Sequence, residues 1–581
     1  MRSHTTIMLL LCLLAPGGCI QQLLSEGDGL VSITATETDG NSTSSTGEPP
    51  TPPTSTDSGV QTVTGDQDST GASPSSSGPD PESSSGDVNP PPTIELFDAS
   101  FPGDLMGDPD HMSEAGRVKL QLVTSADVVK VRLYLDGVKL ADTDLTPADF
   151  PYAWDVLSAK FNGERTFKAE VEDAGGLTAE ETTTLTVQLP QSGTERCIFE
   201  DKAKGASLSL VSAVKYTPEA ILVAGARDTG AGLKMTVWAL DPDHCEVVLP
   251  GWPKTIANWS PEFAALPSVG KALDIDEGGN IVVGGDLFVN GKPQGYVVLI
   301  NEAGSRLWAT ALAPGDEVAG VAAATEQFAD RVVIVGAKRT SDNPVRTDAA
   351  IWIAQASGGA VFVSGPNILA APFAPGEQPD PDNIHSEWVR AVVMQPGTGH
   401  ALGVGEREFK EGGIDLFTRS FTVQIHPLAG VMGTWTSPGD YFKNDAALAL
   451  GVCDGEVIAS GWTREHVDPN AAPQPLTRFI EPDGTSTTRI PEADPGTKIH
   501  GIDCDREGKI VLAGTQSQGG VLEARVSTFT EPLGPRTWYE TGVAGNDGAA
   551  AVACDGRGFC AVGGQRTADN KPYAVVRVFH P

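Results

Sequence analysis

A glycine preceded by four mostly apolar residues occurs seven times between residues 221 and 563. Each copy follows an apolar stretch and a turn, and consecutive glycines are 49 to 69 residues apart. A period of this length is typical of repeat architectures in which each repeat packs on its neighbours. The pattern therefore constrains most of the chain to a repeated fold. The copies are ILVAG (221–225), IVVGG (281–285), VVIVG (332–336), ALGVG (401–405), VIASG (457–461), IVLAG (510–514) and FCAVG (559–563).

A second hairpin follows each of these glycines. An alternating strand leads into a Pro/Gly/Asp turn and often continues to a tryptophan, as in YVVLINEAGSRLWAT (296–310). Four short strands per repeat form one propeller blade, so the sequence predicts an all-β fold with a seven-bladed β-propeller over 195–581. The last repeat lacks a fourth strand, whereas ERCIFED (195–201) precedes the first repeat. We expect this strand to pair with the last blade and close the ring, because closure hides strand edges.

The stretch DIDEGGNIVVGG (274–285) allows three interpretations: a calcium loop, a phosphate-binding loop or a plain β-hairpin. Its acids do not recur at the equivalent positions of other repeats, which read KYTPEA (215–220) or VMQPGTG (393–399). The hairpin is therefore favoured. We interpret the repeated glycine as a strand end where neighbouring blades crowd. One aspartate near the turn recurs, and a bond to the turn backbone accounts for it: Asp276, Asp454, Asp505 and Asp555.

The repeat core, D-x-x-G-x-I-x-V-x-G, resembles the bacterial propeller repeats of the SBBP or delta-60 kind. The resemblance covers roughly residues 195–581. It implies a propeller fold and little about function.

The N-terminus has the features of a secretory signal. Arg2 precedes the apolar segment Ile7–Leu14, which is too short to span a bilayer. The following APGGC (15–19) resembles a bacterial lipobox, which implies removal of residues 1–18 and lipidation of Cys19. Pro16 departs from that pattern, and an ordinary signal peptide is the alternative. Ile20 follows the cysteine and no aspartate is adjacent, so the resemblance implies an outer-membrane or cell-surface location within the cell envelope.

Residues 19–92 form a linker by composition. From Ile20 to Pro92 there is no lysine or arginine, and Ser, Thr, Gly, Pro and acids dominate. Such a composition buries too little apolar surface to offset chain entropy. We expect a disordered tether.

A first folded unit is predicted over residues 93–190. VKVRLYLDGVKLADT (129–143) is typical of two strands joined by an Asp-Gly turn. With PYAWD (151–155) and the strand pair that follows, the order resembles the Ig-like domains of bacterial surface proteins. The resemblance implies an Ig-like β-sandwich. The acidic segment 103–116 is interpreted as a solvated loop, with a calcium site as the alternative.

Six cysteines remain after Cys12 and Cys19 are assigned to the signal and the anchor, an even number for an oxidising compartment. Cys554 and Cys560 flank one turn, and Cys453 and Cys504 occupy equivalent positions in successive repeats. Cys197 and Cys245 remain, and their pairing would hold the closing strand. These three pairings are hypotheses among the fifteen possible for six cysteines.

Charge and motifs exclude several classes of function. The formal charge of −36 over 581 residues argues against binding of nucleic acid or anionic lipid, so membrane contact is expected through a lipid anchor only. The sequence contains no H-E-x-x-H, P-loop, G-x-S-x-G or dinucleotide-binding glycine motif. We therefore predict no cofactor, metal or catalytic residue, and a monomer.

The acidic segment around His385 is a candidate binding site. His385 lies in the acidic stretch QPDPDNIHSEW (378–388), beside Asp380, Asp382 and Glu387, in a predicted long insertion between the third and fourth repeats. Long propeller loops often carry ligand sites, although a polar surface loop is the favoured interpretation. The acids of Gly439–Asp440 and Glu465–Asp468 have the same plain interpretation.

The recognised features serve delivery and display: an anchor, a tether, a spacer domain and a propeller. The sequence therefore favours a binding or scaffolding protein with an unidentified protein or glycan partner. The alternative is a secreted propeller enzyme, a lyase or glycosidase, with carboxylates, His, Tyr or Arg converging in the central funnel. Fold alone does not name the ligand.

Overall fold

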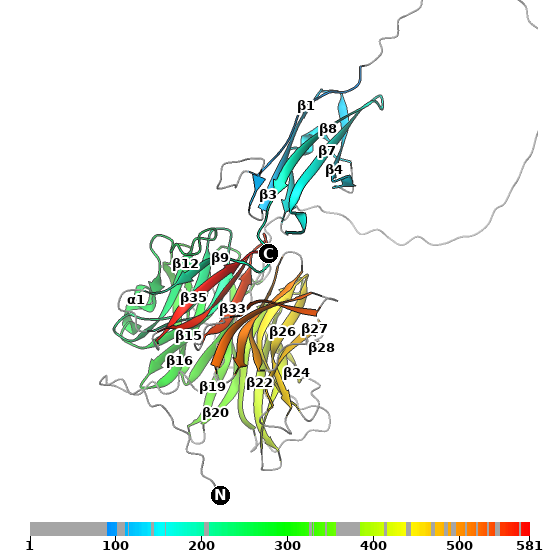
Figure 1. The fold of residues 1–581 in the computed structure, drawn as a ribbon. Coiled ribbons are helices and arrows are strands. Elements are labelled where there is room, and N and C mark those ends of the chain that lie inside the picture. The colour runs from blue at the N-terminus through cyan, green and yellow to red at the C-terminus, as the bar shows by residue number, and fades with distance from the viewer. Residues whose placement is uncertain are drawn as a thin grey trace, which may run out of the picture.

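The computed structural model consists almost entirely of β-strands (Figure 1). The residues it describes are 90–581 except 102–110, 114–115, 141–143, 157–158, 203–207, 325–327, 329, 343–344, 356–383, 412–414, 437–442, 466–470, 482–485, 490–495, 506–507, 519–520, 531–533, 541–546 and 569–570. The helices among them are single turns: η1 (Pro147–Asp149), η2 (Ala159–Phe161), α1 (Ile256–Trp259) and η3 (Pro261–Phe263). Within these ranges, no helix combines the length and the apolar character needed to cross a membrane.

Two sheets form a sandwich at the N-terminal side of the described chain (Figure 1). One sheet has the order β1-β3-β6 and the other β2-β8-β7-β4-β5. Alternating burial along β3 and β7 directs one face of each sheet into a shared core that includes Leu120 and Phe167. The strands are β1 (Ile94–Ser100), β2 (His111–Met112), β3 (Gly116–Thr124), β4 (Val128–Leu135), β5 (Val138–Lys139), β6 (Tyr152–Val156), β7 (Gly163–Asp173) and β8 (Thr178–Val187).

The predicted Asp-Gly hairpin of this unit is present. Asp136 and Gly137 join β4 to β5 and both have positive φ values, 49° and 83°. That geometry belongs to the type I′ turn, which favours Asp-Gly. Part of the predicted acidic loop is a short strand instead, because β2 pairs in parallel with β8.

The seven sequence repeats form antiparallel sheets, which we call units one to seven in chain order. Units one, two, five and six each contain four strands. They are β10 (Ser209–Tyr216), β11 (Ile221–Asp228), β12 (Leu233–Leu240) and β13 (Lys254–Thr255); β14 (Ser268–Ile275), β15 (Ile281–Val289), β16 (Lys292–Ile300) and β17 (Arg306–Pro314); β25 (Lys443–Cys453), β26 (Glu456–Glu465), β27 (Gln474–Ile480) and β28 (Ser486–Arg489); β29 (Thr497–Cys504), β30 (Ile510–Gln518), β31 (Val521–Thr530) and β32 (Gly534–Glu540).

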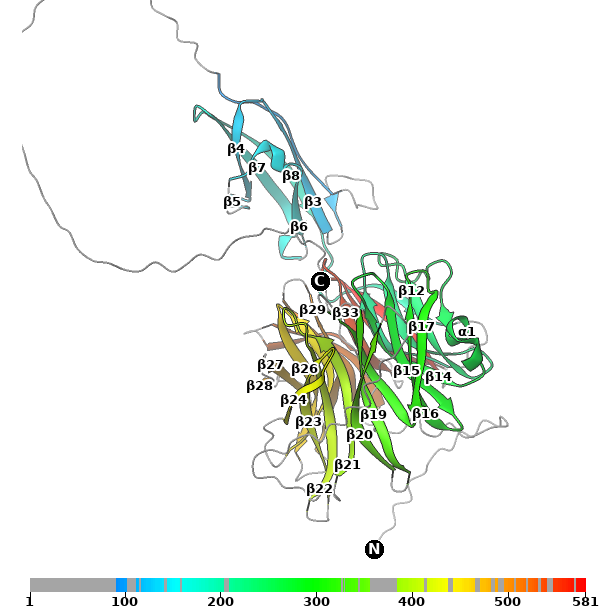
Figure 2. The same ribbon diagram turned by 180° about the vertical axis from the view of Figure 1, so that it is seen from behind.

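Units three and four join into one seven-stranded sheet. The junction is a short parallel contact in which Thr347 of β20 pairs with Ser386 of β21. Figure 2 shows these strands beside those of unit two. The strands are β18 (Asp316–Ala323), β19 (Arg331–Asp342), β20 (Val345–Gln355), β21 (Ile384–Met394), β22 (Ala401–Glu411), β23 (Asp415–His426) and β24 (Gly430–Thr436).

Unit seven combines the end of the chain with a strand that precedes unit one. Its sheet has the order β33-β34-β35-β9, and β9 (Glu195–Glu200) pairs antiparallel with β35 (Lys571–Phe579). The other strands are β33 (Gly548–Cys554) and β34 (Cys560–Ala568). Strands 195–200 and 571–579 are therefore neighbours although they are far apart in the sequence.

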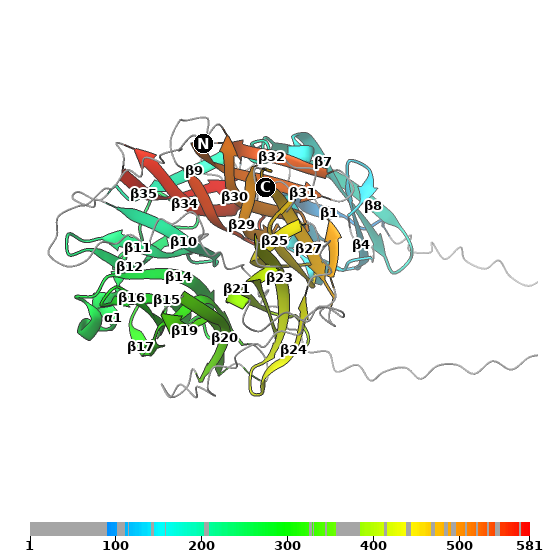
Figure 3. The ribbon, with the colours of Figure 1, turned by 90° about the horizontal axis from the view of Figure 1, so that it is seen from below.

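The first strand of each unit is the inner strand, and the seven inner strands form a closed ring. Each contacts the inner strand of the next unit, and β33 of the last unit contacts β10 of the first. An end view shows the sheets arranged around a centre (Figure 3). Hydrophobic clusters fill the space between neighbouring sheets, such as the one that joins Val223 of unit one to Ala561 of unit seven. The fold is therefore all-β and propeller-like.

Three disulfides link the ring, and they are the three pairs that the sequence favoured. Cys197 of β9 is bonded to Cys245 in the first unit, so the bond joins the last sheet to the first. The second bond joins inner strands of neighbouring units, and the third joins the two strands of one hairpin: Cys453–Cys504 and Cys554–Cys560.

Candidate functional site

Every inner strand contains one β-bulge at the same place. At this point the pairing with the second strand skips one residue, which is left opposite no partner. A bulge bends a strand and re-aims a side chain, and bulges are frequent beside active sites. The seven bulge residues are Ser212, Lys271, Ala319, Arg390, Leu448, His500 and Ala550.

The repeated glycine lies opposite the bulge and lacks a side chain because its own sheet leaves no room for one. A Cβ atom on Gly514 would lie 2.2 Å from the carbonyl oxygen of Lys498, and one on Gly461 would lie 1.9 Å from that of Ala446. Each carbonyl belongs to the inner strand of the same unit. The main cause is therefore the glycine's own sheet and not a neighbouring repeat, although at Gly285 the Cε atom of Met235 in unit one would also lie 2.7 Å from a Cβ atom.

In the seventh unit, the glycine opposite the bulge is one residue after the glycine of the sequence motif. Its bulge glycine is Gly564, whose Cβ would lie 1.8 Å from the carbonyl oxygen of Gly548. The glycine of the sequence motif, Gly563, would instead place a Cβ 2.4 Å from Val214 of unit one. At Gly563 the explanation by neighbouring repeats holds.

The bulge side chains lie at the centre of the ring. Ala319, Leu448 and Ala550 are buried, yet within the described part of the chain none of them belongs to a hydrophobic cluster between neighbouring sheets. Because the inner strands surround one axis, a buried side chain outside the spaces between sheets faces that axis. The bulges therefore direct one residue of each unit inward, two to six residues after the start of its inner strand. The end of the ring where the inner strands begin is called the starting end.

Three equivalent positions recur at each boundary between consecutive units. They are the bulge residue, the residue after the bulge glycine, and the residue two places before the next bulge. We call each set a boundary triplet. Lys271, for example, lies 2.5 Å from Asp286 of its own unit and 3.9 Å from Glu317 of the next. The triplets are Ser212–Ala226–Val269, Lys271–Asp286–Glu317, Ala319–Ala337–Trp388, Arg390–Glu406–Ala446, Leu448–Trp462–Lys498, His500–Thr515–Gly548 and Ala550–Gln565–Leu210.

Two of the triplets contain buried ion pairs. Arg390 Nε donates to Glu406 at 2.7 Å, and both side chains are about nine-tenths buried. Asp286 accepts the 2.5 Å contact from Lys271 and also a hydrogen bond from the backbone N–H of Val318, at 3.0 Å. Buried charges need such partners because desolvation is costly. These two cations are therefore neutralised within their own triplets.

Two tryptophans near the triplets lie against cations, one of which is the Arg390 already described. The Arg390 guanidinium lies 4.8 Å from the ring of Trp388. Trp462 has two such neighbours, with Lys498 Nζ at 5.4 Å and the Arg464 guanidinium at 5.9 Å. Cations within about 6 Å of an aromatic face are attracted by its quadrupole. Contact with an aromatic ring fixes the position of the cation and the direction of its hydrogen-bond donors.

His500 is a neutral imidazole at the centre of the ring. Burial lowers its pKa to about 4, with a smaller contribution from the charge of Lys498. Its Nε2 lies 3.1 Å from Thr515 Oγ1, whereas its buried Nδ1 has no hydrogen-bond partner in the described part of the structure. A buried nitrogen without a partner is unfavourable, so this position suits a bound water or ligand group.

Three carboxyl groups of the fused sheet have raised pKa values, and burial is the main cause for each: Asp316, Asp348 and Glu387. Lys338 opposes the shift at the first two residues. Arg407, whose Nε is 2.5 Å from the carboxylate, opposes it at Glu387. A carboxyl group with a raised pKa can act as a general acid near neutral pH, although structural ion pairs shift pKa values too.

The structure places Glu387 differently from the prediction. His385 and Glu387 lie in strand β21 and not in an insertion loop. Glu387 is buried and paired with Arg407, because cross-strand neighbours share a face of the sheet. The side chain of His385 lies outside the described residues, as do Asp380, Asp382, Gly439–Asp440 and residues 466–468. Glu465 ends β26, and its side chain is also outside them, as is the proposed lipidation site Cys19.

The stretch 274–285, for which a calcium or phosphate loop was the alternative, is a structural hairpin. β14 and β15 pair antiparallel, and Asp274 forms a buried ion pair with Lys215 at 3.0 Å. The second carboxylate oxygen of Asp274 accepts the backbone N–H of Ala323 at 2.8 Å, so the residue links three units. Asp276 accepts backbone hydrogen bonds within its own turn, as do Asp505 and Asp555.

Asp454 differs from the other turn aspartates. It and Gly455 both have positive φ values, 49° and 82°, in a two-residue turn. Asp-Gly favours that backbone geometry by itself. The recurring aspartate thus has two different structural causes.

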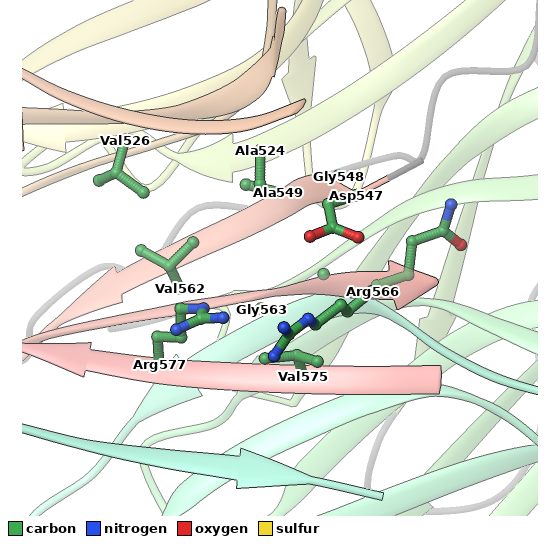
Figure 4. A pocket seen from close by; sticks show the side chains of 12 residues that line it. Ala524, Val526, Asp547, Gly548, Ala549, Val562, Gly563, Arg566, Val575 and Arg577 are labelled. Atoms are coloured by element: carbon green, nitrogen blue, oxygen red, sulfur yellow. The ribbon is translucent and has the colours of Figure 1, made fainter. Parts of the chain in front are cut away.

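A group of potential metal ligands and a small cavity are two further features of the described residues. One group of three potential ligands there lies within 4.8 Å, Cys197, Cys245 and Glu246, but its cysteines form a disulfide. A cavity between units six and seven is flanked by Arg566, Arg577 and Asp547 (Figure 4). Its volume is about 20 Å³, room for about one water molecule.

No family model and no curated protein matches the sequence. The chain is similar to Sqt1 from Chaetomium thermophilum, with 12% identity, a TM-score of 0.38, and coverage of 66% of this chain and 97% of that one. It is also similar to the polysaccharide lyase Uly1, with 9% identity, a TM-score of 0.38, and coverage of 63% of this chain and 89% of that one. A protein of unknown function from Dyadobacter fermentans has 12% identity and a TM-score of 0.36, and the match covers 67% of this chain and 98% of that one. Similarity at this level carries no argument about activity.

Proposed function

We propose that the chain is a lipid-anchored protein of the cell envelope that binds a protein or glycan partner at the starting end of a seven-bladed propeller. In this proposal Cys19 carries the lipid, residues 19–92 form a tether, and the sandwich of residues 93–190 is an Ig-like spacer. The repeats are of the SBBP or delta-60 kind. The molecule acts as a monomer at the outer membrane or cell surface.

The boundary triplets are the observation that carries the binding proposal. The bulge and its glycine recur in every unit, so the backbone at these positions is the same around the ring. The side chains on that backbone nevertheless range from Ala–Ala–Trp to Lys–Asp–Glu and His–Thr–Gly. A constant scaffold with variable chemistry at its centre is the arrangement expected of a ligand site.

Sheet order supports the domain assignments. Four-stranded antiparallel sheets around a common centre are the architecture of a propeller, and the strand from before unit one completes the last sheet. Two packed, mainly antiparallel sheets with a shared core are the architecture of an Ig-like sandwich. The disulfides agree with an oxidising compartment.

The alternative is a propeller enzyme such as a lyase or glycosidase. The raised pKa of Glu387, next to Arg407 at the starting end, favours it as the candidate acid. Glu387 also forms a buried ion pair with Arg407. A carboxylate held in this way is less available as a catalytic acid, so binding is the favoured function. Loss of glycan cleavage in the Glu387→Gln variant, with folding retained, would establish the enzyme instead.

Thermal unfolding with a ligand panel tests the binding proposal. The full chain with Cys19→Ser, which prevents lipidation, is heated with envelope glycans and peptides. A ligand that binds only the folded state raises the midpoint by an amount set by concentration over affinity. We expect a shift that the Arg390→Ala variant loses and the Lys139→Ala variant, in the sandwich, retains. If no ligand of the panel shifts the midpoint, the proposal of a ligand site at the starting end fails.

The anchor has a separate test. Cells producing the wild-type chain are grown with labelled palmitate, and the protein is recovered from the detergent phase. Label on the wild-type protein and none on the Cys19→Ser variant is the expected result. A wild-type protein without label, recovered from the aqueous phase, would show cleavage by an ordinary signal peptidase.

A further inference from the structure

The disulfide that closes the ring lies beside a carboxylate. Cys197 of β9 and Cys245 of the turn after β12 form the bond, and their sulfur atoms and a carboxylate oxygen of Glu246 all lie within 4.8 Å of one another. Among the residues that the structure describes, neither of the other two disulfides has a third potential metal ligand this close. The closing disulfide therefore differs from the others in its surroundings.

Other contacts hold the closing strand to this turn without the disulfide. Arg196, which precedes Cys197, donates to the carbonyl oxygen of Pro242 at 3.3 Å and lies 3.5 Å from the carboxylate of Asp243. The turn that contains Cys245 is closed by two backbone hydrogen bonds of its own, of 2.7 and 2.9 Å. β9 also pairs with β35 in the last sheet. The two cysteines therefore stay adjacent when the bond between them is broken.

Two thiolates and a carboxylate form a ligand set for zinc. Tetrahedral Zn²⁺ binds sulfur at about 2.3 Å and carboxylate oxygen at about 2.1 Å, which places its ligand atoms about 3.5 to 3.8 Å apart. The three atoms at the closure already lie within 4.8 Å of one another, a spacing that side-chain rotation can reduce. Thiolates favour zinc over calcium and magnesium, which prefer oxygen ligands.

The surroundings also give an ion a route to this position. Cys245 is buried in the hydrophobic cluster between units seven and one, whereas Glu246 is exposed. An ion can therefore enter from solvent on the side of the carboxylate, and water can occupy the fourth coordination position.

We propose that reduction of the Cys197–Cys245 bond turns the closure into a zinc site formed by both thiolates and the Glu246 carboxylate. In the reduction a dithiol supplies two electrons and two protons, so the bond becomes two thiols and the dithiol becomes a disulfide. Zinc then displaces one proton from each thiol, because the thiolate is the metal ligand. The oxidised chain does not bind zinc there, since the bond uses both sulfur atoms.

The consequence is that the closing strand is held to unit one in either redox state, by a covalent bond or by the ion. This inference concerns the closure of the ring and does not depend on the ligand site at the starting end.

Calorimetric titration with zinc tests the proposal on the full chain with Cys19→Ser, reduced by a phosphine that supplies no thiolate of its own. We expect the reduced chain to bind one more equivalent of zinc than the double variant Cys197→Ser, Cys245→Ser, which keeps the other four cysteines of the ring. The oxidised chain should lack this equivalent, and calcium should not displace it.

The carboxylate is tested by Glu246→Gln, which changes an exposed side chain and leaves both cysteines in place. Loss of a group that only orients a ligand weakens metal binding about 10- to 100-fold, so loss of the ligand itself should weaken zinc binding at least about tenfold. Glu219→Gln, in the exposed turn between β10 and β11 of the same unit, is the matched control and should bind zinc as the wild type does. Cobalt(II) in place of zinc should give the reduced wild-type chain a stronger thiolate-to-metal absorption than the double cysteine variant.

The unfolding midpoint of the ring reports the closure itself. In reductant, zinc should raise this midpoint for the wild-type chain, since an ion that binds the folded state stabilises it, and should leave the double cysteine variant unchanged. Equal zinc binding by these two proteins, or by Glu246→Gln and the wild type, would overturn the inference, as would calcium binding at this position as tightly as zinc. If circular dichroism shows that the double variant does not fold, the oxidised and reduced wild-type chains and the Glu246→Gln and Glu219→Gln pair carry the test.

Discussion

At several positions of this molecule, the surrounding backbone determines which side chain is present. The glycine opposite each bulge is an example, because a carbonyl oxygen of the inner strand occupies the place of its side chain. The aspartates of the turns are another, since most accept hydrogen bonds from the adjacent backbone. Both residue types are frequent at ligand sites, yet here they maintain the scaffold on which the triplets stand.

Gly514→Ala should destabilise the protein strongly. Its Cβ would lie 2.2 Å from the carbonyl oxygen of Lys498, a backbone atom that cannot rotate away. Overpacking of this kind costs about 3 kcal/mol. Gly278→Ala is the control, because its Cβ would meet only side-chain atoms of Asn280 and Asp276, at 3.2 and 3.3 Å. Denaturant midpoints of the two variants should differ clearly, and equal midpoints would contradict the proposed cause of the repeat glycine.

His500 should make the stability depend on pH. Burial lowers its pKa in the folded chain to about 4, below the ordinary value of 6.5, so between these two pH values the unfolded chain binds a proton that the folded chain does not. The contribution is therefore fully present above pH 6.5 and is lost as the pH falls toward 4. The wild-type free energy of unfolding should decrease over this range more steeply than that of His500→Gln. Parallel pH curves for the two proteins would show that His500 is not held neutral.

Strands and hairpins were predictable from the sequence where their patterns are local. The alternation in residues 129–135 and the Asp-Gly turn predict β4 and β5, and the seven glycine motifs predict the second strand of each unit. The bulges were not predictable, because an extra residue inside a short apolar strand such as SVGKALDI leaves no mark in its composition. A one-residue shift changes the face of every following side chain.

The candidate site was missed for a related reason. Lys498 and Trp462 belong to different units, and only the stacking of sheets brings them together. The sequence instead favoured His385 and Glu387, because they are adjacent to a conspicuous acidic stretch. A signal was nevertheless present: aligning the seven repeats on the glycine shows which positions vary in chemistry.

The closing strand and its disulfide should matter more than a disulfide within a hairpin. Cys197–Cys245 spans 48 residues and joins the last sheet to the first, whereas Cys554–Cys560 spans 6. The loss of loop entropy in the unfolded chain predicts about 4 kcal/mol for the longer loop and about 2 kcal/mol for the shorter. The double variant Cys197→Ser, Cys245→Ser should therefore unfold at lower denaturant than Cys554→Ser, Cys560→Ser. The opposite order would mean that the closing strand is held by its hydrogen bonds and ion pairs alone.

The whole molecule separates two folded bodies with different means of stabilisation. The sandwich has its own hydrophobic core and no cysteine, whereas all three disulfides lie in the ring. The segment between them is held at the end of the chain, where the backbone of His580 exchanges hydrogen bonds with Gly193 and Thr194 at 2.9 Å. The connection therefore leads directly into β9, the strand that completes the ring.

Calorimetry of the full chain should consequently show two unfolding transitions with different responses to reductant. Reduction removes the restraint on the unfolded ring and lowers its midpoint, whereas the sandwich transition should remain where it is. A chain truncated before residue 90 is the control for the transitions of the described part. Removal of residues 90–200 should abolish the sandwich transition and also lower that of the ring, because β9 is lost with it. A single transition that reductant shifts as a whole would show that the two bodies unfold as one cooperative unit.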